Sequence, residues 1–333
     1  MEAVKAIVTD IKQKNLKPLY FLMGEEPYYI DKISDFIANS VLTEEERGFN
    51  QMSFYGKETS VDDIVANAKR FPMMAEHQVV IVKEAQELSR TIENLVSYAE
   101  NPQPTTVLVV CYKYKKLDKR KKLYKTVQKT GVLFESKKLY ENQVADWIRR
   151  VLNGKKYQIS PKAAALLVEF LGTDLSRINN ELEKLFLVVK PGTEITPSVI
   201  EEHIGISKDF NNFELKKAIG ERNISKASRI INYFAQNPKD NPFVLTVTLL
   251  NSFFTQLLKY HGLSDHSPRN VASVLGVSPY FVDEYQVAAK NYPMKRVSKI
   301  VSNLREMDLK GKGVNAQNTS HFDLLKELLV KII

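Results

Sequence analysis

The chain has 333 residues, of which 44% are hydrophobic and 26% are charged, a balance typical of a folded globular protein. That length exceeds one compact core of ordinary size, so we expect two or three domains. No run approaches the ~18 consecutive apolar residues that span a bilayer, and residues 1–18 lack the apolar stretch of a signal peptide, so we expect a cytoplasmic protein without membrane contact.

The first part of the chain alternates predicted strands with predicted helices. A helix over 3–14 is followed by an apolar run at 18–24 that ends in Gly, which is typical of a buried strand entering a turn. Continuous apolar strands that alternate with helices indicate a parallel sheet covered on both faces. We therefore predict an α/β domain over 1–140, with further strands at 51–55, 78–83, 105–112 and 132–135 and helices at 27–40, 61–70, 87–100 and 118–129.

After residue 140 the strand signals stop. A small helical domain is predicted over 141–208, from helices at 142–152, 160–171, 174–189 and 197–203. An all-helical third domain is predicted over 209–333, from helices at 212–220, 225–235, 242–261, 268–275, 279–290, 294–309 and 322–333.

The end of the first strand is where an α/β nucleotide-binding domain carries its phosphate loop, G-x-x-x-x-G-K-[ST]. From Gly24 this chain instead has Tyr29 at the second glycine, Ile30 at the lysine and Asp31 at the hydroxyl residue. The strand over 78–83 ends in Lys83, where an ATPase carries an acid beside magnesium. These losses predict a nucleotidase-like fold that hydrolyses no nucleotide and needs no cofactor; an equally open interpretation is that the fold never bound nucleotide.

Metal chemistry is not indicated either. The single cysteine, Cys111, excludes an internal disulfide and a cysteine-based zinc site, and its apolar neighbours favour a packed thiol. The five histidines are scattered, so we predict no metal site.

The stretch 71–77 places apolar residues where a surface turn is expected, between the helix over 61–70 and the strand over 78–83. A turn that carries Phe71, Met73 and Met74 suggests contact with a partner. The alternative interpretation is that these three side chains belong to the core under the sheet.

The net charge of +9 is concentrated in one segment, because residues 113–129 hold nine Lys or Arg and one acid. A helix over 118–129 would turn Leu123 and Val127 inward and leave the lysines in solvent. Such a helix could lie along phosphates, although a charge run is more often a solvated face. The candidate phosphate contacts are Lys119, Arg120, Lys121, Lys122 and Lys125.

Residues 268–284 resemble a helix-turn-helix, with a turn at Gly276 and Val277. The second helix begins with apolar and acidic residues where base-reading side chains should be polar or basic. Packing between helices is therefore the favoured interpretation of this motif.

Several stretches in fixed order resemble the delta-subunit family of the bacterial DNA polymerase III clamp loader, and the resemblance covers essentially the whole chain. They read PLYFLMGEEP at 18–27, FPMMAEHQVVIVKEA at 71–85, LDKRKKL at 117–123, LGTDLSRINNELEKL at 171–185 and LGVSP at 275–279.

The resemblance implies an AAA+-like first domain with a RecA-type parallel sheet and no working ATP site, a helical lid, and a helical collar that joins the other loader subunits, tau/gamma and delta prime. Members of the family bind and open the sliding clamp, the beta subunit, by inserting two adjacent bulky apolar side chains. Met73 and Met74 stand at those positions, where many relatives have Leu or Phe, and Phe71 would support them from behind. Primed DNA inside the assembled loader is the partner implied for the basic segment.

Two other functions stay open at this point. An autonomous AAA+ ATPase or helicase would need tight nucleotide binding by the isolated chain. A helix-turn-helix regulator would need sequence-specific binding to duplex DNA.

Overall fold

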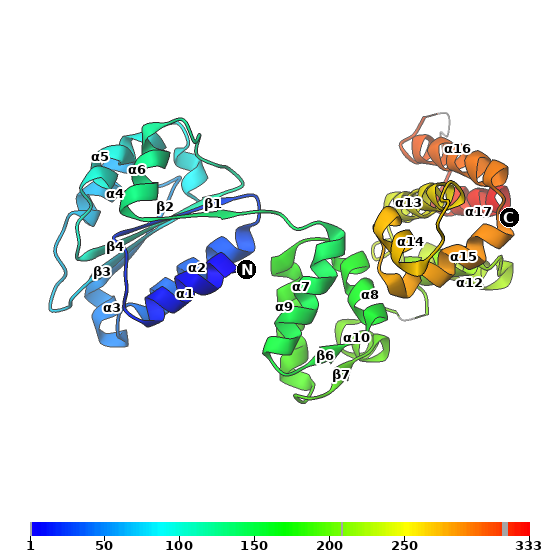
Figure 1. Ribbon diagram of the computed structural model, residues 1–333, viewed down its shortest axis with the longest axis horizontal. Helices are drawn as coiled ribbons and strands as arrows, with labels where there is room; N and C mark the ends of the chain where they lie inside the picture. The colour runs from blue at the N-terminus through cyan, green and yellow to red at the C-terminus, as the bar shows by residue number, and fades with distance from the viewer. Residues whose placement is uncertain (1, 208, 315–318) are drawn as a thin grey trace. The chain divides into compact units, whose positions relative to one another are not determined.

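The computed structural model describes residues 2–207, 209–314 and 319–333. Within it the chain forms two compact units, one that ends at Leu139 and one that begins at Tyr140 (Figure 1). The division of the second unit into domains over 141–208 and 209–333 stays a prediction, and the boundary residue 208 lies outside the described residues. None of the described helices is long and apolar enough to cross a lipid bilayer.

A five-stranded sheet, parallel throughout, forms the centre of the first unit and confirms the predicted α/β class. The strands are β1 (Leu19–Gly24), β2 (Gln51–Tyr55), β3 (Gln78–Lys83), β4 (Thr106–Lys113) and β5 (Val132–Ser136). They lie in the order β2-β3-β4-β1-β5, so the first strand is central and β2 and β5 are the edges. In the register, Tyr20 pairs with Val109 on one side and Val132 on the other.

Helices cover both faces of this sheet, because strands that are apolar on both sides need a cover on each. They are α1 (Glu2–Lys12), α2 (Pro27–Ser40), α3 (Glu44–Asn50), α4 (Val61–Ala68), α5 (Val96–Glu100) and α6 (Lys122–Thr130), with 3₁₀ turns η1 (Ala85–Leu88) and η2 (Ile92–Leu95). α1 and α2 share a core with Tyr20 and Leu22, and α4, α5 and α6 share one with Phe21 (Figure 1). Cys111 is a buried thiol in the first of these cores, as predicted, and burial raises its pKa to about 11.

Two predicted helices of this unit were wrong in extent. The helix expected over 87–100 is broken into η1, η2 and α5, and at the break the Thr91 hydroxyl donates to Leu88 O, a local bond that competes with the helix. The helix expected from residue 118 begins at Lys122, because the Asp118 carboxylate accepts from the backbone N–H of Arg120 at 3.0 Å and forms a turn first.

Three elements were not predicted. α3 begins with a capping box in which the Thr43 hydroxyl accepts from Glu46 N and the Glu46 carboxylate accepts from Thr43 N. In the second unit, β6 (Gln158–Ile159) and β7 (Glu194–Ile195) form a short parallel pair. Two-residue strands are too short for a periodic pattern in the sequence to reveal.

The second unit is otherwise helical, as predicted. Its helices are α7 (Glu141–Gly154), α8 (Pro161–Leu171), α9 (Leu175–Val188), α10 (Pro197–Ile204), α11 (Asn212–Gly220), α12 (Ile224–Gln236), α13 (Phe243–His261), α14 (Pro268–Leu275), α15 (Val282–Asn291), α16 (Met294–Gly311) and α17 (His321–Ile332), with the 3₁₀ turn η3 (Pro279–Phe281). α8 begins as expected, with Ser160 as its N-cap and Pro161 in the first turn.

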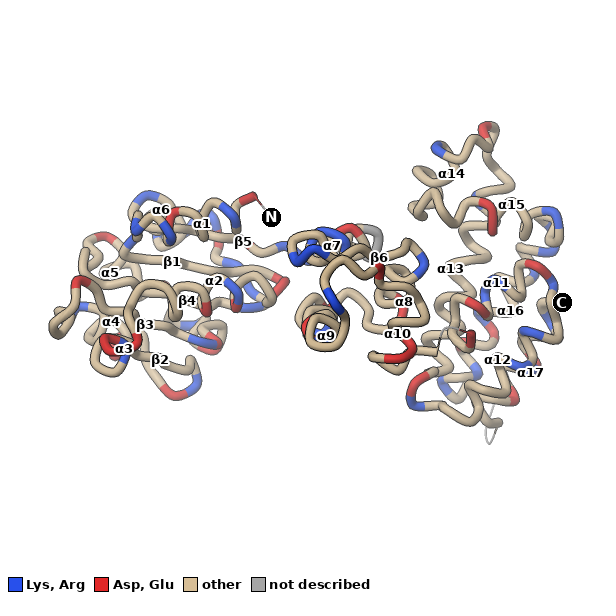
Figure 2. Tube along the Cα trace, turned by 90° about the horizontal axis from the view of Figure 1, so that it is seen from below, with Lys and Arg blue, Asp and Glu red and all other residues tan. Residues whose placement is uncertain are grey.

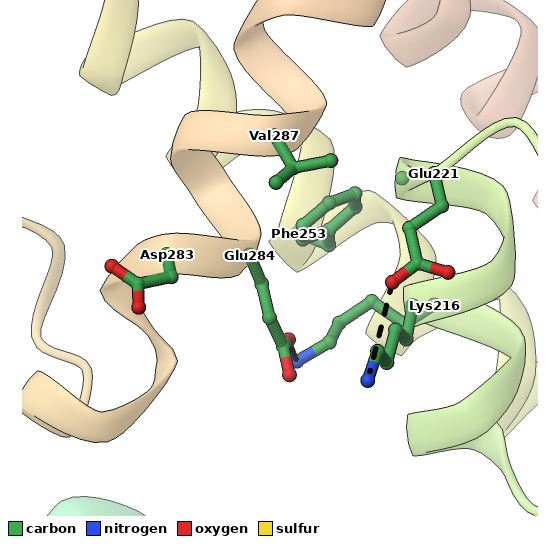
Figure 3. Close-up of a pocket in the computed structure, with 8 residues that line it drawn as sticks. Lys216, Glu221, Phe253, Asp283, Glu284 and Val287 are labelled. Atoms are coloured by element: carbon green, nitrogen blue, oxygen red, sulfur yellow. Dashed lines mark ion pairs between the residues drawn. The ribbon is translucent and has the colours of Figure 1, made fainter.

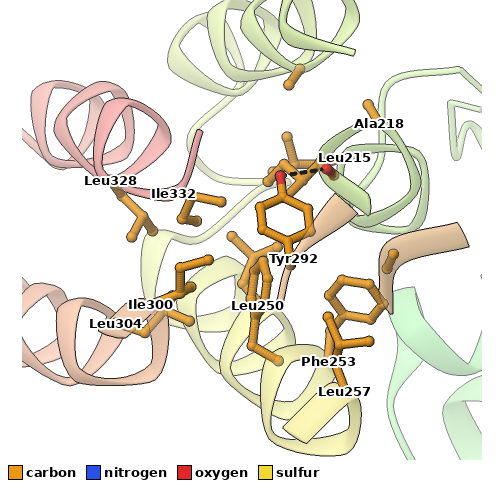
Figure 4. Close-up of a cluster of buried hydrophobic side chains, with 14 of the residues drawn as sticks. Leu215, Ala218, Leu250, Phe253, Leu257, Tyr292, Ile300, Leu304, Leu328 and Ile332 are labelled. Atoms are coloured by element: carbon orange, nitrogen blue, oxygen red, sulfur yellow. Dashed lines mark hydrogen bonds between the residues drawn. The ribbon is translucent and has the colours of Figure 1, made fainter. Parts of the chain in front are cut away.

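The long helix α13 lies at the centre of the largest core of this unit (Figure 4). Leu250 and Phe253 of α13 share this core with Ile300 of α16 and Leu328 of α17. The Tyr292 hydroxyl donates to Ile219 O at 2.8 Å, which satisfies the one polar atom of a fully buried ring.

Candidate functional site

Residues 71–77, here termed the tip, connect α4 to β3 and carry the exposed apolar side chains that the sequence singled out. Met73 is 63% exposed, Phe71 is 76% exposed and Met74 is exposed in full. The core interpretation of these residues is therefore excluded. Phe71 lies on the surface like the two methionines, and its support of them from behind stays a prediction.

One buried side chain holds the tip. The Met73 N–H donates to Oδ1 of Asn50 at 2.6 Å, and Nδ2 of Asn50 donates to Met73 O at 2.9 Å. Asn50 is 2% exposed and ends α3, and the residue before it, Phe49, is 74% exposed. Met74, the residue after Met73, has a left-handed conformation with φ of 54°, which is uncommon for a residue other than glycine.

The base of the tip is fixed by polar residues buried at the start of β3 and β4. Gln78 Nε2 donates to the carbonyls of Asn67 (3.2 Å) and Arg70 (2.6 Å) and to the Thr106 hydroxyl (2.8 Å). That hydroxyl in turn donates to Ala68 O at 2.8 Å. The last carbonyls of α4, which have no partner inside the helix, are thereby satisfied, and the sheet becomes a rigid mount for the tip.

The opposite end of the sheet, where the parallel strands finish, is termed here the carboxyl edge. Glu26 is buried there as the N-cap of α2 and accepts from Tyr28 N at 3.0 Å, so the helix N-terminus that would face a phosphate already holds a carboxylate. Ile30, at the position of the phosphate-loop lysine, is fully buried in the core. Gly24 has φ of 130°, and a Cβ on it would lie 2.0 Å from Ser136 O, so the close approach of β5 accounts for this glycine.

An ion-pair cluster fills the centre of the carboxyl edge. Lys113 Nζ lies 2.8 Å from the carboxylate of Asp31 and 2.9 Å from that of Glu84. Burial by itself would lower the pKa of Lys113, but the hydrogen bonds to the two acids outweigh it and raise the pKa. The hydrogen bond from Lys113 holds the pKa of Glu84 below its usual value. The carboxylate of Asp31, at the position of the phosphate-loop hydroxyl, is therefore paired with a lysine of the protein itself.

The basic segment is largely neutralised by its own neighbours. Figure 2 shows Lys and Arg along α6 and the loop before it. Arg120 pairs with Asp118 at 2.7 Å, Lys122 with Glu100 at 2.6 Å, and Lys121 lies 3.9 Å from Glu93. Of the five candidate phosphate contacts, Lys119 and Lys125 are the two for which the described residues show no ion pair.

A pocket of about 200 Å³ lies in the second unit between α11, α13 and α15 (Figure 3). Lys216 pairs with Glu284 at 3.1 Å across it, and Lys217 lies 3.9 Å from Glu221. Phe253 also lines it. Both lysines are balanced by acids of the same pocket, which disfavours an anionic ligand there.

The helix-turn-helix motif consists of α14, η3 and α15. Gly276 takes the left-handed conformation at the turn, with φ of 68°. α15 buries Val282, Tyr285 and Ala288 in the unit's core. α15 is the helix that would have to read bases, and these three side chains pack in the core instead.

Sequence reasoning missed Asn50, Phe49 and Gln78. The capping-box pattern Thr43-x-x-Glu46 was a usable signal for α3 and hence for a helix end at Asn50. Nothing in the sequence indicates that the amide of Asn50 bonds to a residue 23 positions later.

Comparison with known proteins gives consistent matches. A family model described as DNA polymerase III, delta subunit, matches residues 20–137, and one described as DNA polymerase III delta subunit, C-terminal domain, matches residues 209–328. The DNA polymerase III subunit delta of Bacillus subtilis (strain 168) is 28% identical over 308 residues, 90% of this chain and 88% of that protein. The solved structure of the Bacillus subtilis DNA clamp loader delta protein shares 26% identity, with a TM-score of 0.55 over 99% of both chains. The RuvB Holliday junction branch migration motor of Thermotoga maritima is 15% identical over 87% of both chains, with a TM-score of 0.38.

Proposed function

The chain belongs to the delta-subunit family of the DNA polymerase III clamp loader, and we propose that it captures the ring-shaped sliding clamp through Met73 and Met74 and opens it for loading onto primed DNA. The observation that carries this proposal is the exposed methionine pair on a rigidly mounted turn. Phe71, which is also exposed, is proposed as a third apolar contact. As a replication protein the chain is expected in the cytoplasm.

The chemistry of the tip suits a partner with an apolar pocket. Fully burying a Met side chain contributes roughly 1.5–3 kcal/mol, and apolar anchors that enter a pocket act as hot spots of protein interfaces. Met is unbranched and flexible, so it adapts to pockets that also accept Leu or Phe. Two adjacent methionines on one turn can therefore supply much of the free energy of a stable contact.

Binding of the purified chain to the clamp of the same organism tests the proposal directly. Surface plasmon resonance with the clamp immobilised should show saturable binding by the isolated chain. A folded chain that does not bind the clamp, with or without the other loader subunits, would contradict the proposal.

We further infer that the chain does not hydrolyse ATP and that neighbouring loader subunits do. Support comes from the carboxyl edge, where the Glu26 carboxylate occupies the helix N-terminus and Asp31 is paired with Lys113. Both features put protein groups where the phosphates and magnesium of a nucleotide would bind.

Titration calorimetry of the isolated chain with ATP and magnesium should therefore show no heat of binding at micromolar concentrations. The matched control is the ATPase subunit of the same loader, titrated under the same conditions. Tight binding of ATP by this chain would revive the alternative of an autonomous ATPase.

The C-terminal helices, residues 209–333, are proposed to form the collar that assembles with tau/gamma and delta prime. The family model for the C-terminal domain matches this region, and its core around α13 is large enough to make it a stable scaffold. The tip belongs to the first unit, so the proposed collar and the proposed contact with the sliding clamp use different parts of the chain.

Within the assembled loader, Lys119 and Lys125 are the proposed contacts to the phosphates of primed DNA. Replacing both with Glu should make the plot of log affinity against log salt concentration less steep by about 2, because each neutralised phosphate contributes about 0.9 to the slope. Binding of the loader to primed DNA, measured by fluorescence anisotropy over a salt series, checks this. Lys5→Glu/Lys17→Glu, at exposed lysines of and after α1, is the charge-matched control, and an equal change in both variants would count against the proposed contact.

A further inference from the structure

Between its two ends, the tip is hydrogen-bonded to the rest of the first unit through Asn50. Within residues 71–76, the backbone hydrogen bonds found in the described chain are the two that join Met73 to the side-chain amide of Asn50. A third bond, from Nδ2 of Asn50 to Glu46 O at 3.1 Å, ties the same amide to α3. The Asn50 amide therefore donates through Nδ2 and accepts through Oδ1 at the same time. It bonds to both the N–H and the C=O of Met73, as the backbone of a neighbouring β-strand would.

The residue after this pairing is the one that needs conformational support. Met74 has φ of 54°, in the left-handed region, where a side chain with a Cβ costs free energy relative to the right-handed region. Its own side chain is exposed in full and has no core contact to hold it there. Such a conformation persists only when the surrounding structure imposes it. The adjacent constraint is the pair of hydrogen bonds between Asn50 and Met73.

We infer that Asn50 is a positioning residue that holds the tip in the one conformation in which Met74 projects toward its partner. This inference rests on the proposed function, because it assigns the preparation of the docking surface to a buried residue that does not touch the partner. A tip already in its bound conformation loses less conformational entropy on association. Without the two hydrogen bonds from Asn50, the tip adopts the binding-competent conformation for only a fraction of the time, and its apparent affinity for the sliding clamp falls by that fraction.

Two variants of Asn50 test the inference. Asn50→Ala removes both bonds to Met73, and Asn50→Asp keeps the size and the acceptor but places a carboxylate oxygen against two carbonyls. We expect the association rate constant with the sliding clamp to fall about tenfold while the dissociation rate constant stays within about twofold, since two hydrogen bonds of ordinary strength are lost and no contact to the clamp changes. Hydrogen exchange of the Met73 amide, measured without the sliding clamp, should accelerate to the same degree in Asn50→Ala, because this variant removes the acceptor of the Met73 N–H.

The matched control is Asn39→Ala. The Asn39 amide makes the same kind of bond within its helix, to Asp35 O at 2.8 Å, but none to the tip. It should leave Met73 exchange and both rate constants unchanged. If Asn50→Ala does not fold, the inference stands or falls on Asn50→Asp.

Unchanged exchange at Met73 in a folded Asn50→Ala variant, an unchanged association rate constant in Asn50→Asp, or an affinity loss carried by faster dissociation alone would overturn the positioning role. The proposed function fails separately, through a Met73→Ala/Met74→Ala variant that still binds the clamp. In that case the exchange measurement on Asn50 keeps its meaning as a test of how the tip is held.

Discussion

Replacing both Met73 and Met74 with Ala should weaken binding of the chain to its sliding clamp by at least about a hundredfold. Even the lower figure of about 1.5 kcal/mol for each buried side chain sums to about 3 kcal/mol, and every 1.4 kcal/mol is tenfold in affinity. Because both side chains are exposed, the free energy of unfolding should change by less than about 0.5 kcal/mol. Surface plasmon resonance for affinity and urea unfolding for stability measure the two quantities separately.

The control for this variant is Met294→Ala on α16. Met294 is 51% exposed, so the substitution removes the same side chain from a different part of the surface. We expect its affinity for the clamp to match that of the unchanged chain. A double variant at the tip that stays folded and binds as tightly as Met294→Ala would mean that the clamp is held elsewhere.

Gly24→Ala should lower the free energy of unfolding by about 2–6 kcal/mol. A φ of 130° is strained for any residue with a Cβ, at a cost of about 1–3 kcal/mol, and the new carbon would lie 2.0 Å from Ser136 O, which adds the cost of forcing β1 and β5 apart, about 1–3 kcal/mol. Urea unfolding of the full chain followed by circular dichroism gives the value. The result matters for function because it would assign Gly24 to the packing of β1 against β5 and not to the binding of phosphate.

Gly48→Ala is the counterpart for that measurement. Gly48 lies inside α3, and a Cβ on it would meet no atom within 4 Å. The substitution should raise the free energy of unfolding by about 0.5–1 kcal/mol, the usual gain from replacing a helical glycine. If Gly24→Ala proves as harmless as Gly48→Ala, the ends of β1 and β5 separate more easily than their geometry indicates.

The sequence predicts much of the fold because burial and turn signals repeat along it. The helix over 27–40 and the strands over 51–55 and 78–83 have the predicted bounds, since Pro27 marks a helix start and the strands have clear ends. The break at Thr91 was not predictable, because one side-chain hydrogen bond there competes with an otherwise acceptable helical pattern.

The candidate site was predictable only in part. The sequence shows that Phe71, Met73 and Met74 are apolar, but it cannot show whether these side chains are buried in the core or exposed to solvent. The hold of Asn50 on Met73 and the pairing of Lys122 with Glu100 join positions 23 and 22 residues apart, and such pairs depend on the tertiary fold. Among the five candidate phosphate contacts, the described residues show ion pairs for Arg120, Lys121 and Lys122. The sequence alone could not show which of the five would be paired.

The tip and the ion-pair cluster lie at the two ends of one strand. The tip enters β3 at Gln78, and Glu84 follows the last residue of β3 and is bound to Lys113 at the end of β4. A strand of six residues at about 3.3 Å each is about 20 Å long, and β3 is hydrogen-bonded along both sides. β3 therefore holds the two features at opposite ends of one hydrogen-bonded strand. A substitution that breaks the ion pair of Glu84 with Lys113 would therefore act at the opposite end of the strand from Met73 and Met74, and would test the carboxyl edge without touching the tip.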